Sequence, residues 1–201
     1  MFKKLSPVAL STIPVLLALN VATGLVVGGL KLPVYLDAIG TCLAALLLYP
    51  LGLTGLLAAI AVGVGSFVIS GALFNPVLFW FIGTQVVIAI YSYAVFARHL
   101  HAQVNPSLRR TIAIATFHGI VLGLICAIVN APVVALVFGG VTGSGVSLIA
   151  AVLLKAGQSL WTATINFGLL TEPLDKGLQC IAAGLVYRSL DRAGIRIEGN
   201  R

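Results

Sequence analysis

The run Leu53–Leu73, with the sequence LTGLLAAIAVGVGSFVISGAL, decides the class of fold because it contains no charged residue. A helix rises ~1.5 Å per residue, so a run of this length crosses the ~30 Å hydrocarbon core of a bilayer. The rest of the chain has the same character: of 201 residues, 60% are hydrophobic and 8% are charged, and the mean hydropathy is +1.12. A soluble domain carries about 25% charged residues and could not bury this much apolar surface. The composition excludes a soluble enzyme, a disordered chain and a disulfide-rich secreted module, and it predicts an integral membrane protein.

Six hydrophobic segments are expected to cross the membrane, which predicts an all-α protein with a six-transmembrane-helix bundle. Proline and glycine mark several of their ends, since the residue before a proline avoids the helical conformation. The second segment is short, and the fifth contains a proline that is expected to kink it. The expected spans are Pro7–Leu30, Ala38–Leu51, Leu53–Leu73, Val77–Ala97, Thr111–Phe138 and Pro173–Leu190. They form one domain over residues 1–190, followed by a charged tail over residues 191–201.

The segment Gly139–Thr171 is ambiguous, because its part Ser147–Leu170 is long enough to span but contains Lys155, Gln158 and Asn166. Basic residues gather on the cytoplasmic side of membrane proteins. If the segment does not span, this rule places both termini and nine basic residues in the cytoplasm, against three outside. The nine are Lys3, Lys4, Arg98, Arg109, Arg110, Arg188, Arg192, Arg196 and Arg201, and the three are Lys31, Lys155 and Lys176. We therefore expect an outer loop and helix that cover the bundle, although a spanning or re-entrant helix stays open.

Three of the five acidic residues, Asp37, Glu172 and Asp175, lie near span ends on the expected outer side. Acidic residues at the edge of a membrane are costly and indicate function. The alternative is helix capping, because Asp37 and Asp175 both lie where a helix is expected to begin. The two roles are compatible.

The segment before the last span has polar residues on one helical face: Lys155, Gln158 and Thr162 follow i, i+3, i+7 spacing. Such a face should meet protein or water, which favours a lid over a ligand. Lys155 could pair with one of the acids, hold an anionic ligand or extend to the membrane interface. Trp161 or Tyr35 could stack on a flat ring.

Polar residues inside the spans are Asn20, Gln85, His118 and Asn130. Hydrogen bonds between helices explain them most simply. Asn130, near the outer end of its span, is the better candidate for a pocket. Ala18 and Ala22 form a small-residue face on the first span, which suits close packing within the chain or docking of a partner.

Catalytic and metal-binding motifs are absent from the sequence, so we expect no enzyme, no cofactor and no metal. HExxH, GxSxG and Walker A patterns do not occur, and the glycine-rich run at 139–145 lacks the Lys of a P-loop. His99, His101 and His118 do not have metal-ligand spacing. The net charge of +7 is read as membrane topology, with no nucleic-acid partner.

Several residue runs, taken in order, resemble the substrate-binding (S) components of energy-coupling factor (ECF-type) ABC transporters, which are bacterial vitamin importers. The resemblance covers roughly residues 5–190. The runs are LPVYLDAIGT at Leu32–Thr41, YPLG at Tyr49–Gly52, FGGVTGSG at Phe138–Gly145, AGQS at Ala156–Ser159 and EPLDK at Glu172–Lys176.

This resemblance implies a six-helix bundle in the bacterial cytoplasmic (inner) membrane, with both termini inside and a substrate pocket near the outer face. It also implies that Ala18 and Ala22 dock a transmembrane coupling (T) subunit, which works with two cytoplasmic ATPase subunits. The expected function is capture of a vitamin or another scarce organic nutrient from outside, for ATP-driven uptake. The expected substrate-binding residues are Asn20, Tyr35, Asp37, Asn130, Lys155, Gln158, Trp161 and Asp175.

Three alternatives stay open at this point. The chain could be a ligand-sensing membrane module with a separate signalling partner, or a solitary facilitator that works without ATPases. A membrane enzyme is the weakest of them, because so few acids are available to it.

Overall fold

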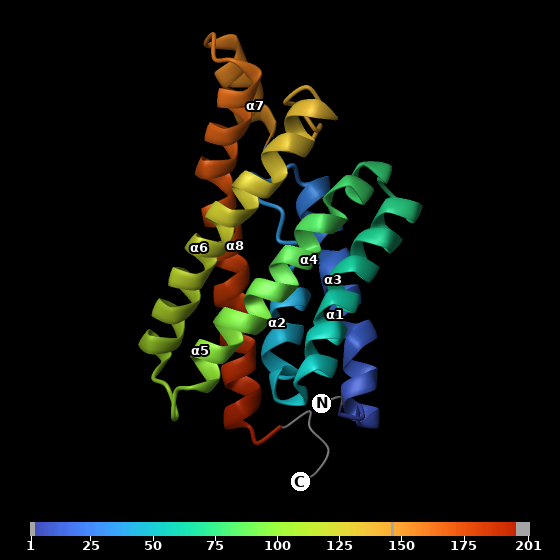
Figure 1. The fold of residues 1–201 in the computed structure, drawn as a ribbon, viewed down its shortest axis with the longest axis vertical. Helices are drawn as coiled ribbons and strands as arrows, with labels where there is room; N and C mark the ends of the chain where they lie inside the picture. The colour runs from blue at the N-terminus through green and yellow to red at the C-terminus, as the bar shows by residue number, and fades with distance from the viewer. Residues whose placement is uncertain (1–2, 146, 196–201) are drawn as a thin grey trace.

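A computed structural model describes residues 3–145 and 147–195, which form a bundle of helices (Figure 1). The elements are α1 (Pro7–Gly29), α2 (Ile39–Leu47), η1 (Tyr49–Leu51), α3 (Leu53–Leu73), η2 (Pro76–Phe81), α4 (Ile82–Tyr91), η3 (Ser92–Ala97), α5 (Arg98–His101), α6 (Leu108–Leu136), α7 (Ser147–Lys155) and α8 (Leu160–Arg192). Four helical stretches of the described chain are long and apolar enough to cross a membrane, namely α1, α3, Pro76–His101 and α6. The expectation of an all-α membrane protein is therefore confirmed at this level.

The apolar segments largely begin and end where the sequence predicts. The helix α3 covers Leu53–Leu73 as expected, and α1 ends one residue before its expected end. The fourth segment is a helix of mixed type, because η2 is a 3₁₀ helix and η3 is a π-helix on either side of α4. At its start the Asn75 side chain accepts a hydrogen bond from the Val77 backbone N–H at 3.2 Å, which caps the turn after α3.

The last helix differs from its prediction. We expected a span that begins at Pro173, but α8 begins at Leu160 and continues through that proline. The start of α8 is capped by Ser159, whose hydroxyl accepts from the Thr162 N–H at 3.2 Å. Before it, Gly157 has a φ of +87°, a left-handed conformation that ends α7 and suits glycine. The segment Ser147–Leu170 is therefore two helices.

This break also overturns the expected polar face. Lys155 is the last residue of α7, Gln158 lies in the turn and Thr162 lies in α8, so the three do not share one helix. A helical spacing in sequence gives a common face only if the helix is continuous.

Helices α6 and α8 lie side by side over most of the molecule's length (Figure 1). Small residues allow their backbones to approach. A Cβ atom on Gly119 would overlap the backbone at Gly177, and one on Gly123 would overlap Pro173. Such contacts stabilise helix pairs in a membrane through close packing.

Helix α2 lies at the centre of the bundle and is buried from Gly40 to Leu46. Gly40 packs so closely on α1 that a Cβ atom there would overlap the Leu16 carbonyl oxygen. With nine residues and a rise of ~1.5 Å per residue, α2 is too short to cross ~30 Å of hydrocarbon. The connection from α1 to α2 must therefore descend into the bundle, and irregular backbone at that depth has to be covered by protein or a water-filled cavity.

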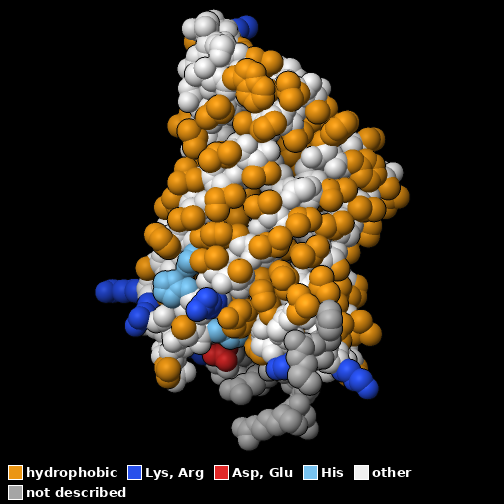
Figure 2. All heavy atoms as spheres, in the orientation of Figure 1, with side chains coloured by type: hydrophobic (Ala, Val, Ile, Leu, Met, Phe, Trp, Pro, Cys, Tyr) orange, Lys and Arg blue, Asp and Glu red, His pale blue; other side chains and the backbone are white. Residues whose placement is uncertain are grey.

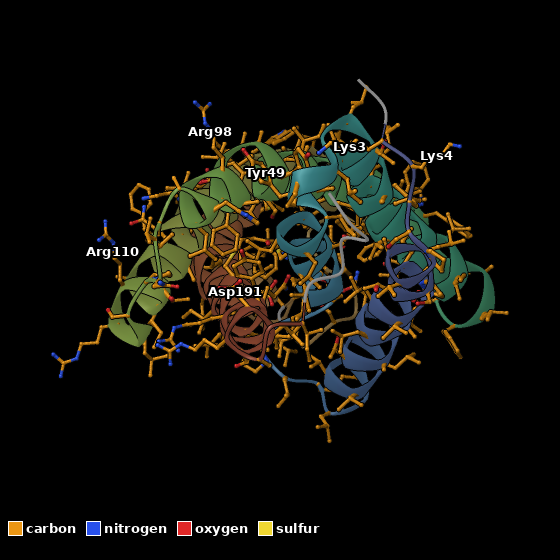
Figure 3. All side chains as sticks on the ribbon, turned by 90° about the horizontal axis from the view of Figure 1, so that it is seen from below. Lys3, Lys4, Tyr49, Arg98, Arg110 and Asp191 are labelled. Carbon is orange, nitrogen blue, oxygen red and sulfur yellow. The ribbon has the colours of Figure 1, made fainter. Side chains whose placement is uncertain are left out.

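The two ends of the molecule differ in charge. Helix α1 begins and α8 ends at the same end (Figure 1), where Lys3, Lys4, Arg98 and Arg110 are displayed (Figure 3). Figure 2 shows an apolar surface between this end and the tip at the opposite end, where α7 lies. Exposed apolar side chains along the helices suit contact with lipid. Arg196 and Arg201, which we also expected at the basic end, lie outside the described residues.

Lys176 corrects the expected distribution of charge. We expected it on the outer surface, but only 3% of this residue is exposed, in the middle of α8. The helix begins earlier than predicted, so the charged residues Glu172, Asp175 and Lys176 are buried in the bundle instead of lying at its edge.

Candidate functional site

A cavity of 440 Å³ lies between α1, α3, α4, α6 and α8. This volume falls within the range of about 300–1,000 Å³ that is usual for small-molecule sites. Residues 31–37 and 142–145 contribute to its wall. The Lys31 ammonium donates to the Gly143 carbonyl at 3.3 Å, and Gly145 lies so close to the Lys31 carbonyl that a Cβ atom would overlap it. The two connections thus touch at one side of the cavity.

Most of the cavity wall is apolar, with aromatic rings from several helices. A site of this kind favours a ligand with an apolar body, and a few polar groups fix its orientation. The apolar lining includes Val27, Phe67, Phe81, Ile88, Val134 and Phe167.

A buried group of charges borders the cavity and is organised around Asp175 of α8. One carboxylate oxygen of Asp175 accepts the backbone N–H groups of Tyr35 and Leu36 at 2.8 and 2.9 Å. The other accepts from the Lys176 ammonium at 2.6 Å and the Gln179 amide at 2.7 Å. Asp175 therefore satisfies two backbone N–H groups of the connection that descends before α2.

Glu172, one turn earlier in α8, lines the cavity and is 3% exposed. Its Oε1 accepts from the Asn130 side-chain amide at 2.8 Å, and Asn130 in turn accepts from the Thr84 hydroxyl. Its Oε2 is buried and receives no hydrogen bond. The nearest cationic atom is Lys176 Nζ at 3.5 Å. A buried carboxylate oxygen that accepts no hydrogen bond is costly, and this oxygen has only the ion pair with Lys176.

Lys176 lines the cavity as well, but its charge is compensated on the protein side. Its ammonium contacts Asp175 at 2.6 Å and Glu172 at 3.5 Å. It also lies 5.9 Å from the centre of the Tyr35 ring, within range of a cation–π interaction. The positive charge is thus held by α8 and by the connection that precedes α2.

Asp37 is half-buried in the cavity wall, in the connection before α2. Among the described residues, no side chain donates a hydrogen bond to it. Burial raises the pKa of its carboxyl from 3.8 to about 6; Lys176 lowers this pKa, and the charges of Asp175 and Glu172 raise it. Asp37 therefore presents a carboxylate to the cavity at neutral pH and loses much of this charge below pH 6.

Asn20 of α1 lines the inner wall of the cavity and connects three other segments. Its amide nitrogen donates to Thr41 at 2.9 Å and to Ser66 at 3.3 Å, and its oxygen accepts from the Gly40 N–H at 2.6 Å. Thr41 continues the network to Gln85 of α4 at 3.2 Å. All of these groups are buried, so the network fixes the relative positions of α1, α2, α3 and α4.

The structure brings half of the expected binding residues to one cavity. Asn20, Tyr35, Asp37 and Asn130 line it. Asp175 does not line it but lies directly behind its wall, where it holds Tyr35.

The remaining expected binding residues lie elsewhere, around the turn between α7 and α8. Lys155 is exposed, Trp161 is 47% exposed, and Gln158 accepts a hydrogen bond from Asn166 at 3.1 Å. None of the three lines the cavity. The lysine that pairs with the acids is Lys176, so a pair with Lys155 is not formed.

The alternative role of the two aspartates, helix capping, is not what the structure shows. Asp175 lies in the interior of α8, and the N-cap of α2 is Ala38, which makes no side-chain cap hydrogen bond. Asp175 instead accepts hydrogen bonds from the backbone of the α1–α2 connection, and Asp37 lines the cavity.

The expected binding residues did not include Glu172 and Lys176, two charged residues that line the cavity, although Glu172 was among the acids that indicate function. A signal was present, because an acid four residues before a lysine forms a favourable pair on a helix. It was misread because the helix was expected to begin at Pro173.

Ala18 and Ala22, the expected docking residues, are exposed on α1.

A group of aromatic and histidine side chains lies toward the basic end. His118 accepts or donates at both ring nitrogens, to the Tyr91 hydroxyl at 3.0 Å and to His99 at 2.9 Å. Within residues 3–145 and 147–195, no group of three His, Cys, Asp or Glu residues could hold a metal ion.

No family model, curated protein or solved structure matches this chain.

Proposed function

We propose that this protein is the substrate-binding subunit of an energy-coupling factor importer, which captures a vitamin or another scarce organic nutrient for ATP-driven uptake. The observation that supports this most strongly is the cavity with its unsatisfied buried carboxylate oxygen on Glu172. A protein whose only task was to pack in lipid would gain nothing from such a group, because buried polar atoms without partners destabilise a fold.

The proposed topology has six crossings, with both termini in the cytoplasm. Helix α2 would make a short crossing completed by the connections at its ends, and α8 would make the last one. The basic end would face the cytoplasm by the positive-inside rule. The cavity, which is bordered by the connections at residues 31–37 and 142–145, would then lie toward the outside. That side suits capture of a nutrient.

The energy for uptake would come from other subunits, since the sequence contains no Walker A motif. The exposed Ala18 and Ala22 of α1 would contact the transmembrane coupling subunit. Small residues on a lipid-facing helix allow a second helix to approach closely.

Purification from native membranes in a mild detergent tests this proposal. A coupling protein and two ATPase subunits should co-purify with the wild-type chain. They should be lost from the A18L/A22L variant, whose larger side chains block close approach. Ala113 is exposed on α6, so the A113L variant is a control for an added leucine elsewhere and should keep the complex.

Two other results, one from this purification and one from an uptake assay, would reject the importer. A histidine kinase or another regulator in place of ATPases would indicate a ligand sensor. Uptake of the nutrient in cells that lack all coupling subunits would indicate a solitary facilitator.

A further inference from the structure

We propose that the ligand of the cavity is a small organic cation, with an amine or amidine nitrogen held between Glu172 and Asp37 and an apolar body against the aromatic wall. This inference rests on the proposed function, because it names the chemical class of the captured nutrient. It follows from how many hydrogen-bond donors each buried charge already has.

The buried charges beside the cavity do not balance. Three carboxylates, Asp37, Glu172 and Asp175, lie around the buried ammonium group of Lys176. Lys31 is the other lysine of the cavity wall, but it is exposed at the edge and donates to the Gly143 carbonyl. Buried charges are stable when they are paired. The buried part of the site therefore has an excess of acceptors, and a ligand that brings a positive charge would compensate it.

The carboxylate oxygens that lack hydrogen-bond donors indicate where the positive group of the ligand binds. Both oxygens of Asp175 are used, by two backbone N–H groups, Lys176 and Gln179. Glu172 uses Oε1 for Asn130, and its buried Oε2 receives no hydrogen bond, with Lys176 Nζ 3.5 Å away as an ion-pair partner. Asp37 lines the same cavity and receives no hydrogen bond from a described side chain. Glu172 and Asp37 are thus the two carboxylates with free acceptor capacity.

An anionic ligand is disfavoured for the same reason. Lys176 is engaged by Asp175 at 2.6 Å and by Glu172 at 3.5 Å. Lys31, at the edge of the cavity, donates to the Gly143 carbonyl. A ligand carboxylate would therefore approach two carboxylates and would have to displace a lysine from its partners. Like charges in a site of low dielectric repel each other strongly.

The apolar wall of the cavity favours an apolar body in the ligand, next to the charged nitrogen. Phe67, Phe81 and Phe167 contribute aromatic surface, and Asn130 with Thr84 provides neutral polar groups. At 440 Å³ the cavity has room for a ring system in addition to the charged nitrogen. Tyr35 and the phenylalanines could also contact a delocalised cation through their ring faces.

Three probes of one size and different charge test the inference: 4-phenylbutylamine, 4-phenylbutanol and 4-phenylbutyrate. Binding to the purified full-length protein is measured by calorimetry at pH 7.5. A charge-assisted hydrogen bond contributes about 1.5–3 kcal/mol, so the amine should bind ~10- to 100-fold more tightly than the alcohol. The carboxylate should bind more weakly than the alcohol.

Variants assign the effect to the named oxygens. Glu172→Gln and Asp37→Asn keep the size of the side chain and remove its charge, so each should abolish most of the preference for the amine. Asp191→Asn makes the same chemical change at the opposite, basic end of the molecule (Figure 3), and it should leave the preference intact. Thermal unfolding of each variant shows whether it is folded, and binding of the neutral alcohol gives a second check on the cavity.

Some results would overturn the inference. These are tighter binding of the carboxylate, equal binding of all three probes, no binding of any probe at millimolar concentration, or an amine preference that survives in both cavity variants. The ligand class and the importer function can fail independently of each other. If the cavity prefers the amine but no ATPases co-purify, the importer is rejected and the cationic ligand is supported. If the ATPases co-purify but the cavity prefers the carboxylate, the importer is supported and the cationic ligand is rejected.

Discussion

Asp175 and Tyr35 lie 140 positions apart in the sequence, and the Asp175 carboxylate accepts the Tyr35 backbone N–H at 2.8 Å. The same oxygen accepts the neighbouring Leu36 N–H, at a residue whose φ of +51° is unusual for a side chain of this size. One acid of α8 thus holds the irregular backbone that forms part of the cavity wall. This contact connects the last helix of the bundle to the site where we place the ligand.

Replacement of Asp175 should destabilise the protein strongly. Asp175→Ala leaves two backbone N–H groups without an acceptor and removes the closest partner of Lys176. Loss of one partner of a buried ion pair costs about 3–5 kcal/mol. Asp175→Asn should cost less, since its amide oxygen can still accept the two N–H groups. Melting temperatures in detergent should fall in the order wild type, Asp175→Asn, Asp175→Ala. Equal stability of Asp175→Ala and wild type would contradict the role of Asp175 in holding the connection before α2.

The contact between α6 and α8 should be sensitive to a single methyl group. A Cβ atom on Gly123 would overlap the backbone at Pro173, so Gly123→Ala should lower the free energy of unfolding by about 1–3 kcal/mol. Gly83→Ala is the matched control, because no atom lies within 4 Å of the added Cβ there. If the two variants unfolded at the same temperature, the proposed close packing would be wrong.

The hydrogen-bond network at Asn20 should stabilise the inner wall of the cavity. Asn20→Ala removes the acceptor of the Gly40 N–H and the donor to Thr41 and Ser66. A buried polar group that loses its partner costs about 1–3 kcal/mol. Ser11→Ala removes only an exposed hydrogen bond to Val8, and we expect little change from it. Thermal unfolding of the two variants compares them directly, and equal losses would argue against the network.

Stability should decrease as the pH rises through about 6, because of Asp37. Its pKa in the folded protein is about 6, compared with an ordinary value of 3.8, so the folded state favours the protonated acid. Its contribution to stability is fully present below pH 4 and is lost as the pH rises through 6. Asp37→Asn removes this titration. The difference in melting temperature between wild type and Asp37→Asn should therefore change between pH 4.5 and 7.5, and a constant difference would contradict the raised pKa.

Hydropathy was enough to predict the long apolar helices. The limits of α1 and α3 follow from uninterrupted apolar runs. Helix α6 begins at Leu108, three residues before its expected start, where the Ser107 hydroxyl accepts the Arg110 N–H. The last helix could not be predicted in the same way. Pro173 and the charges beside it are typical of the start of a helix at a membrane edge. In the structure the helix continues through Pro173, and the backbone there packs against Gly123 of α6.

The site could be predicted only in part, for a related reason. Asp37 and Asn130 stand out in sequence as polar residues near span ends, and both line the cavity. Glu172 and Lys176 belong to the site because α8 is continuous there, and no local pattern shows that Asp175 meets the backbone at Tyr35. Contacts over such a separation depend on how the helices pack. The common polar face of Lys155, Gln158 and Thr162 required one continuous helix, which the turn at Gly157 interrupts.

Mass spectrometry of small molecules extracted from the gently purified protein tests the central claim most directly. Wild type and Asp191→Asn should release the same compound, near one per protein, and it should carry a basic nitrogen. Glu172→Gln should retain folded structure by thermal unfolding and lose most of this compound. An empty wild-type protein after growth in rich medium, or a compound that Glu172→Gln and Asp37→Asn retain in full, would contradict the account of a ligand held at this cavity.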